Sequence, residues 1–191
     1  MRSILFRLCF AGLLLSFATA RADLMVPMPV EEMAAHSKLI LQGKVVSTTV
    51  LRDDTGEIYT KVDLQVDEVW KGSLATNHFT IVLGGGILGD EGVSISGQVE
   101  YEVGEEVVAF LVLNSRGEGV TLGLSQGKFH VWADPATGEK LVHNPFHGLR
   151  PSAPNPNRPA VAPSPHIHPP PALINRLTLA DLKGRCAGGV K

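Results

Sequence analysis

Hydrophobic and polar positions alternate most clearly along IYTKVDLQVD, residues 58–67. Alternation with a period of two is typical of a strand that has one buried face and one face in water. The segment EVVAFLVL at 106–113 is apolar almost throughout, with the length and composition of a buried strand. We expect both segments to face one core, with these inward residues: Ile58, Thr60, Val62, Leu64, Val66, Val108, Phe110 and Val112.

Shorter β-type segments and turns occupy most of the remaining chain up to residue 144. The segment SKLILQGKVVSTT at 37–49 is apolar and β-branched, and Gly43 inside it is typical of a bulge. Further strands are predicted at 79–83 and 120–124. The segments 127–132 and 139–143 flank a turn and predict a hairpin. Many short strands with little helix favour a β-barrel or a β-sandwich.

Two short helices are predicted, one on each side of this β-rich region. Residues 30–37 place apolar side chains three to four apart after an acidic start, which suits about two helical turns. In the segment LTLADLK at 177–183, Thr178 is the predicted N-cap and Asp181 its capping-box partner. The intervening residues 145–171 are rich in proline, which predicts an extended linker.

The first 22 residues have the pattern of a secretory signal peptide, with cleavage after Ala20 or Ala22. Their apolar run is too short to span a bilayer, so no stable membrane insertion is expected after cleavage. A secreted or periplasmic location follows. The predicted map has four parts: a signal peptide at 1–22, a β-barrel domain at 23–144, a Pro-rich linker at 145–171, and a short helix with a tail at 172–191.

Signal cleavage changes both the charge and the cysteine content of the chain. Cleavage after Ala22 removes three of the 17 basic residues, so 14 remain against 19 acidic ones and the net charge becomes −5. Such a chain has no basic surface for nucleic acid. Cys186 alone remains, so no internal disulfide forms, and the residue is interpreted as a free thiol or the partner in an intermolecular disulfide. Its place near the C-terminus predicts a frayed tail.

A glycine-rich stretch, IVLGGGILGDEG at 81–92, contains the GxGxxG spacing of dinucleotide-binding loops. That loop requires a following helix, whereas Val93 and Ile95 alternate with serines, and the acidic residues would repel phosphate. No nucleotide cofactor is therefore predicted, and the stretch is interpreted as a flexible loop across one mouth of the barrel. Because loops on a rigid scaffold commonly carry recognition, its predicted binding residues are Gly85, Gly86, Asp90 and Glu91.

Catalytic and metal-binding patterns give no site. Ser94 and Ser96 lie in no GxSxG elbow, and no His-Glu-x-x-His pattern occurs. Paired acids in turns are interpreted as solvated loop charge, because no EF-hand spacing accompanies them. The histidines at 166 and 168 lie among prolines. Together with those at 143 and 147, they are interpreted as polar residues of an exposed linker and not as metal ligands. No catalytic residue, metal or cofactor is predicted.

Several short motifs together resemble a family of secreted bacterial proteins of unknown function, over roughly residues 28–133. They are SKLILQGKV (37–45), EVWKG (68–72), Gly85-Gly86, VGEEVVAFL (103–111) and SQGKF (125–129). The first two also resemble the start of the netrin and tissue-metalloproteinase-inhibitor module, a five-stranded OB-type barrel. The resemblance implies a mainly β fold, an OB-like barrel of five to seven strands with a short helix near each end.

The resemblance to the animal inhibitors does not extend to their chemistry. They coordinate the protease zinc through an N-terminal cysteine and have a disulfide-stapled barrel, whereas this mature chain would begin at Arg21 or Asp23 and lacks cysteine until Cys186. Two function classes remain. The favoured one is an exported noncatalytic module that binds a protein or polysaccharide, including an inhibitor-like partner of a secreted protease. The alternative is a secreted or periplasmic hydrolase with a site assembled from scattered residues.

Overall fold

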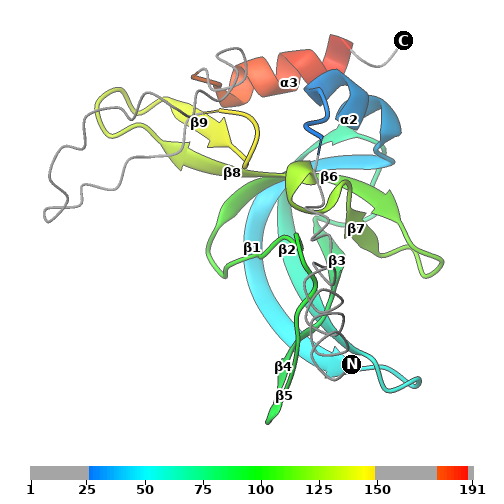
Figure 1. Ribbon diagram of the computed structural model, residues 1–191. Coiled ribbons are helices and arrows are strands. Elements are labelled where there is room, and N and C mark those ends of the chain that lie inside the picture. Colours follow the sequence, from blue (N-terminus) through cyan, green and yellow to red (C-terminus); the bar gives the residue numbers. More distant parts are fainter. Residues whose placement is uncertain (1–25, 149–175, 189–191) are drawn as a thin grey trace, which may run out of the picture.

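A computed structural model describes residues 26–148 and 176–188 of the 191-residue chain (Figure 1). The predicted signal peptide and residues 149–171 of the predicted linker, with His166 and His168, lie outside these ranges. The described elements are α2 (Val30–His36), β1 (Leu39–Arg52), β2 (Ile58–Lys71), β3 (His78–Gly84), β4 (Gly86–Leu88), β5 (Glu91–Val93), β6 (Glu106–Leu113), β7 (Gly119–Thr121), the 3-10 helix η1 (Leu124–Gly127), β8 (Lys128–Ala133), β9 (Lys140–His143) and α3 (Leu179–Gly188).

Five strands close into a ring in the order β1-β2-β3-β7-β6, because β6 pairs back with β1. β3 and β7 run parallel, and the other neighbours in the ring are antiparallel. β8 also pairs with the N-terminal half of β6, and β9 pairs with β8. We call these two strands the β8–β9 arm. The chain is therefore mainly β with an OB-like barrel and two short helices, which confirms the predicted fold class.

The predicted bulge at Gly43 is confirmed on the long β1–β2 pair. Gly43 pairs with Val66, whereas the preceding Gln42 pairs with Glu68, so Asp67 is an extra residue on β2. Glycine suits this place because a Cβ at position 43 would collide with the backbone of β2. One extra residue reverses the alternation of side chains between the two faces of a strand. Beyond the bulge, β2 therefore turns a different set of side chains outward.

Strand β6 separates two hydrophobic cores. The barrel core lies on its inner side and contains Leu39, Leu41, Val45, Val62, Leu64, Val66, Ile81, Leu83, Val99, Tyr101, Val107, Ala109 and Leu111. The second core lies on its outer side, between β6, the β8–β9 arm and the two helices, and contains Val30, Met33, Ala34, Ile40, Val108, Phe110, Phe129, Val131, Val142, Leu182 and Cys186. Figure 1 shows both helices at the same end of the molecule.

The predicted register is right for β2 and wrong for β6. On β2 the apolar members of the alternating set are buried, and Thr60 is half-buried. On β6, Val108 and Phe110 lie in the second core and Val112 is half-buried, whereas the residues between them enter the barrel. A strand buried on both faces is apolar throughout, so its sequence contains no period that assigns a face.

Polar contacts cap one end of each helix. Lys71 Nζ, from the end of β2, donates to the carbonyls of Ala34 and Ala35 at 2.7 and 3.1 Å, which caps the last turn of α2. The predicted capping box of α3 is confirmed: Asp181 N donates to Thr178 Oγ1 at 2.9 Å, and Thr178 N to Asp181 Oδ2 at 3.4 Å.

Two sequence-based expectations about the C-terminal half are corrected. Cys186 is not in a frayed tail: it lies on α3, is 3% exposed and belongs to the second core. An intermolecular disulfide needs an accessible sulfur atom, so it could form only if α3 undocked from the second core. Residues 145–148, predicted as the start of the linker, are also part of the fold, because His147 is buried and its Nε2 lies 2.9 Å from the Met28 carbonyl oxygen.

Candidate ligand-binding sites

The glycine-rich stretch forms a hairpin of β4 and β5, in which Gly86 pairs with Val93 and Leu88 with Glu91. Figure 1 shows this hairpin at the end of the barrel opposite α2 and α3, where it extends outward. The expected loop across the barrel mouth is therefore a projecting pair of strands. The alternation of Val93 and Ile95 with serines correctly argued against a helix after the glycines, although residues 94–96 themselves lie beyond the end of β5.

The two glycines predicted to bind a partner set the course of the backbone into hairpin β4–β5. Gly85 is buried with φ of 78°, its N–H donates to the Ile58 carbonyl at 2.9 Å, and its carbonyl accepts from Thr60 Oγ1 at 2.8 Å. Gly86 has φ of 139°, and a Cβ there would press on Thr60 and Val50. Both positions require glycine for conformation and close packing. Neither provides a side chain for contact with a partner.

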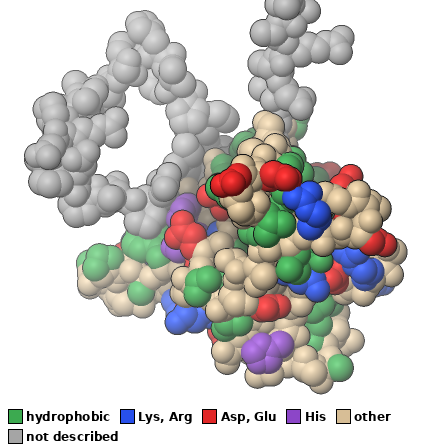
Figure 2. All heavy atoms as spheres, turned by 90° about the horizontal axis from the view of Figure 1, so that it is seen from below, with side chains coloured by type: hydrophobic (Ala, Val, Ile, Leu, Met, Phe, Trp, Pro, Cys, Tyr) green, Lys and Arg blue, Asp and Glu red, His purple; other side chains and the backbone are tan. Residues whose placement is uncertain are grey.

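The exposed side chains of the hairpin and its flank are apolar and acidic. Ile87 is 77% exposed, Val93 47% and Ile95 44%. Asp90 at the tip is exposed, and Glu91 Oε2 lies 2.6 Å from Arg52 Nη2 at the end of β1. Figure 2, which views the molecule from below, shows hydrophobic, acidic and basic side chains interspersed on this face. The four predicted residues therefore lie together, but Asp90 and Glu91 alone are exposed.

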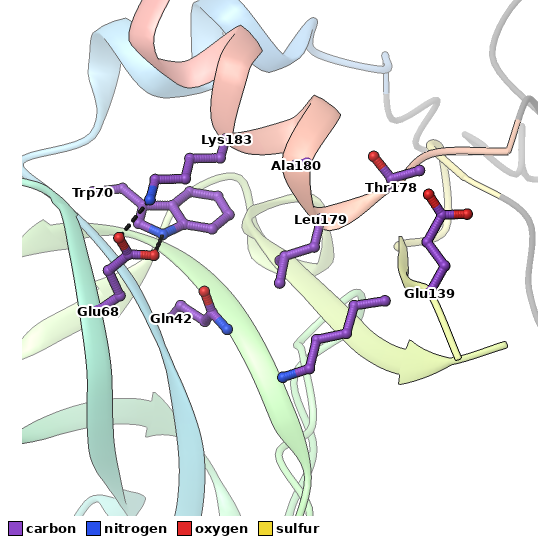
Figure 3. Close-up of a pocket in the computed structure, with 9 residues that line it drawn as sticks. Gln42, Glu68, Trp70, Glu139, Thr178, Leu179, Ala180 and Lys183 are labelled. Atoms are coloured by element: carbon purple, nitrogen blue, oxygen red, sulfur yellow. Dashed lines mark hydrogen bonds and ion pairs between the residues drawn. The ribbon is translucent and has the colours of Figure 1, made fainter. Parts of the chain in front are cut away.

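A second candidate site, which we call the α3 groove, lies between the first turns of α3, the start of β9 and the outer face of β1 and β2. Its volume is about 290 Å³. Figure 3 shows side chains from the barrel and from α3 on its two sides. The lining residues are Gln42, Glu68, Trp70, Glu139, Lys140, Thr178, Leu179, Ala180 and Lys183. Sequence reasoning missed this site.

The bulge at Gly43 explains how the barrel contributes to the α3 groove. Because Asp67 is the extra residue, Glu68 lies opposite Gln42 instead of continuing the inward set that ends at Val66. Trp70 is the extra residue at a second irregularity, where Leu41 pairs with Val69 and Ile40 with Lys71, and it lines the groove and packs against the second core. The glycine in the middle of 37–49 was a signal for the bulge, but the opposing residue on the partner strand could be found only once the pairing was known.

The Trp70 indole is held in place by a chain of polar contacts. Its Nε1–H donates to Glu68 Oε2 at 2.9 Å, and the other oxygen of Glu68 forms an ion pair with Lys183 of α3. The hydrogen bond from Lys183, followed by that from Trp70, lowers the pKa of the Glu68 carboxyl, so it is ionised at neutral pH. These contacts and the packing of Trp70 against the second core favour this orientation of the ring at the groove.

The remaining charges around the α3 groove are also paired. Lys140 Nζ contacts the two oxygens of Glu106 at 2.7 and 2.9 Å, and Gln42 Nε2 donates to Glu106 Oε1 at 2.9 Å. Glu139 Oε2 lies 2.7 Å from Nη2 of Arg176. Each charged lining residue thus has a partner of opposite sign. The groove has no excess charge with which to attract an ion.

A third cluster surrounds Glu105, whose side chain is only 9% exposed. Its oxygens contact Lys128 Nζ at 2.5 Å and His130 Nδ1 at 2.8 Å. A carboxylate that orients a histidine occurs in many catalytic sites. Within 26–148 and 176–188, however, no serine, threonine or cysteine side chain hydrogen-bonds to His130, and no three metal-ligating side chains gather anywhere. In these ranges the cluster joins the segment before β6 to β8.

No protein-family model and no curated protein matches this chain. Its function is therefore inferred from the candidate sites alone. Among the described residues, neither helix has the length and apolar character needed to span a bilayer.

Proposed function

We propose that this chain is an exported, noncatalytic binding module that recognises a protein partner through hairpin β4–β5. The observation that carries the proposal is the exposure of three aliphatic side chains on and beside a projecting hairpin: Ile87, Val93 and Ile95. Ile87 lies on the face of the hairpin that carries Gly92, and Val93 lies on the other face, so apolar side chains are exposed on both sides of the hairpin. Exposed apolar side chains gathered on one projecting element commonly mark a protein interface. The glycines behind it fix the position of the hairpin on the barrel.

The chemistry of the hairpin favours a protein partner with an apolar pocket and a basic rim. Aliphatic side chains fill pockets at interface centres, and charges at the rim guide association. Asp90 is a rim carboxylate, and the charge of Glu91 is partly neutralised by Arg52 at 2.6 Å. A negatively charged rim disfavours nucleotides. The resemblance to the netrin and metalloproteinase-inhibitor module supports a protein partner, including a secreted protease.

The hydrolase alternative depends on a single arrangement, the contact between Glu105 and His130 at 2.8 Å. It would require a nucleophile or an activated water beside His130. If a hydrolytic activity of the purified protein were lost in His130→Ala and retained in Ile87→Ser, the alternative would replace the proposal.

The proposal is tested by capturing partners from a periplasmic or extracellular extract with immobilised mature protein. Ile87→Ser and the double variant Asp90→Asn/Glu91→Gln should keep the thermal stability of the parent within about 0.5 kcal/mol, as expected for exposed positions, yet capture less partner. Val26→Ser is the matched control, because Val26 is 71% exposed and lies in the segment before α2. Equal capture by all variants would remove the hairpin from the interface.

The same protein tests the absence of nucleotide binding. Neither NAD, ATP nor FAD should raise its melting temperature, because the glycines serve hairpin geometry and the neighbouring carboxylates repel phosphate. A rise of several degrees with any of them would contradict this interpretation of the glycine-rich stretch.

A further inference from the structure

We infer that the α3 groove is a second binding site, separate from hairpin β4–β5, and that it takes a neutral saccharide by stacking one sugar ring against Trp70. The inference goes beyond the proposed function, because the groove and the hairpin lie at opposite ends of the barrel (Figure 1). Three properties of the groove support it: a fixed aromatic ring, internally neutralised charge and small size.

Trp70 supplies a rigid surface for stacking. Its indole N–H is bonded to Glu68 at 2.9 Å, and Glu68 is held in turn by Lys183 from α3. Restricting the ring before binding reduces the entropy lost when a ligand binds. The face of an aromatic ring carries partial negative charge, so it packs favourably against the weakly positive C–H face of a pyranose. Leu179 and Ala180 add apolar surface on the opposite side (Figure 3).

The charges around the groove indicate an uncharged ligand. Lys183 is paired with Glu68 and Lys140 with Glu106, so an anion would compete with an existing carboxylate for either ammonium. A cation would likewise compete with Lys183 for Glu68, or with Arg176 for Glu139. Hydroxyl groups need no such exchange, because ionised carboxylates retain free lone pairs and an ammonium has three donors. The same side chains can therefore bind sugar hydroxyls while their ion pairs persist.

The size of the groove favours a small ring over a protein surface. Its volume of about 290 Å³ is at the lower end of the range for small-molecule sites. A stable protein interface needs roughly 1,000 Å² or more of buried surface, which a groove of this size does not supply.

Intrinsic fluorescence provides the test, because the chain has two tryptophans. In a Trp132→Phe background, Trp70 is the only fluorophore of this kind. Neutral hexasaccharides of β-1,4-linked glucose, β-1,4-linked N-acetylglucosamine and α-1,4-linked glucose are titrated into the mature protein. At least one of them should change the emission of Trp70 in a saturable way. A hexasaccharide of galacturonic acid should bind about tenfold or more weakly, because its carboxylates would have to compete with Glu68 and Glu106 for the paired lysines.

The matched variants are Ala180→Arg and Ala187→Arg on α3. Both alanines are exposed, but Ala180 lines the groove and Ala187 does not. Ala180→Arg should abolish the titration without lowering the melting temperature, whereas Ala187→Arg and Ile87→Ser should leave it unchanged. If Ile87→Ser also lost the saccharide, the groove would not be a separate site.

Two further results would overturn the inference. One is the absence of any emission change with all three neutral hexasaccharides up to about 10 mM, a concentration above the weak end of specific affinities. The other is a response that persists in Ala180→Arg. A neutral hexapeptide rich in leucine serves as the competing probe. If it binds the parent protein and the saccharides do not, the groove is a peptide site and the saccharide assignment is wrong.

Discussion

The two cores on either side of β6 differ in how the chain builds them. The barrel core comes from residues 39–111 and is closed by strands that pair in a ring. The second core joins α2, near the start of the described chain, to α3 at its end, with the β8–β9 arm between them. Strand pairing, including the return of β6 to β1, therefore holds the first core, whereas the second depends on the docking of helices from the two ends of the described chain.

This difference extends to the two candidate sites. Hairpin β4–β5 packs on the β1–β2 pair and needs only the barrel, because Gly86 lies against Val50 and Thr60. The α3 groove exists only while α3 is docked, since Leu179, Ala180 and Lys183 form its outer side. Perturbing the second core should therefore impair the groove and leave the hairpin intact.

The largest expected effect comes from placing a charge in the barrel core. Leu64 is fully buried and its neighbour Gln65 is exposed. Leu64→Asp should unfold the domain, because it loses apolar burial and leaves an unpaired carboxylate in the core, at a cost above about 4 kcal/mol. Gln65→Asp should change the free energy of unfolding by less than about 0.5 kcal/mol. Equal melting temperatures for the two variants would contradict the observed register of β2.

Much of the barrel could be predicted because several of its strands have recognisable patterns within short segments of sequence. The alternation at 58–66, the apolar run at 106–113 and the bulge glycine all have signals in short segments. The face of β6 could not be predicted, since both of its faces are buried. Cys186 was misplaced for a related reason. Its burial comes from the docking of α3 against α2 and the second core, whose residues are distant in sequence and leave no mark on the C-terminal segment itself.

Of the candidate sites, the hairpin could be located from the sequence and the groove could not. Asp90 and Glu91 were found because a glycine-rich stretch with acids is visible in one segment. The groove combines Gln42, Trp70 and Ala180 from three separate segments. Its existence depends on the pairing that follows the bulge and on where α3 docks, and neither is a property of a single stretch of sequence.

A substitution in the second core should produce the next largest effect. Leu182 is fully buried on α3, and Leu182→Ala should cost about 2–5 kcal/mol through lost burial and a cavity. The readout is the rate at which Cys186 reacts with a thiol reagent. Burial raises the pKa of this thiol to about 12, so the native protein should react slowly and the variant much faster.

The matched control for Leu182→Ala lies two residues further along α3. Gly184 is exposed and has open space around its Cα, so Gly184→Ala should stabilise the helix by about 0.5–1 kcal/mol and slow the labelling of Cys186. If labelling of Leu182→Ala accelerated only together with global unfolding, the two cores would form one cooperative unit and the contrast between them would be wrong.

A smaller effect is expected at the start of α3. Thr178 Oγ1 accepts from the backbone N–H of Asp181 at 2.9 Å. Thr178→Ala removes this cap and should lower the free energy of unfolding by about 1 kcal/mol, whereas Thr178→Ser should retain most of it. Chemical denaturation measures the difference. Similar losses for serine and alanine would show that the methyl group of Thr178, and not its hydroxyl, stabilises this end of the helix.

The smallest effect is a change in the pH dependence of stability caused by His147. Burial, opposed by the hydrogen bond to the Met28 carbonyl, lowers the pKa of the His147 imidazole. Arg185 lowers it further, and Glu31 opposes that change. Between the folded pKa and the unfolded value of about 6.5, the unfolded chain binds more protons. Stability should therefore fall as the pH decreases through this window, and this contribution should be constant above pH 7.

The measurement is the melting temperature at intervals between pH 7.5 and 5. His147→Gln removes the titrating group and keeps a side-chain donor toward Met28, so its melting temperature should fall less steeply below about pH 6.5 than that of the parent. His78→Gln, at an exposed position of β3, controls for the loss of one histidine. Parallel curves for the parent and His147→Gln would mean that His147 is protonated equally in both states. The contact between residues 145–148 and the segment before α2 would then make no pH-dependent contribution to the free energy of unfolding.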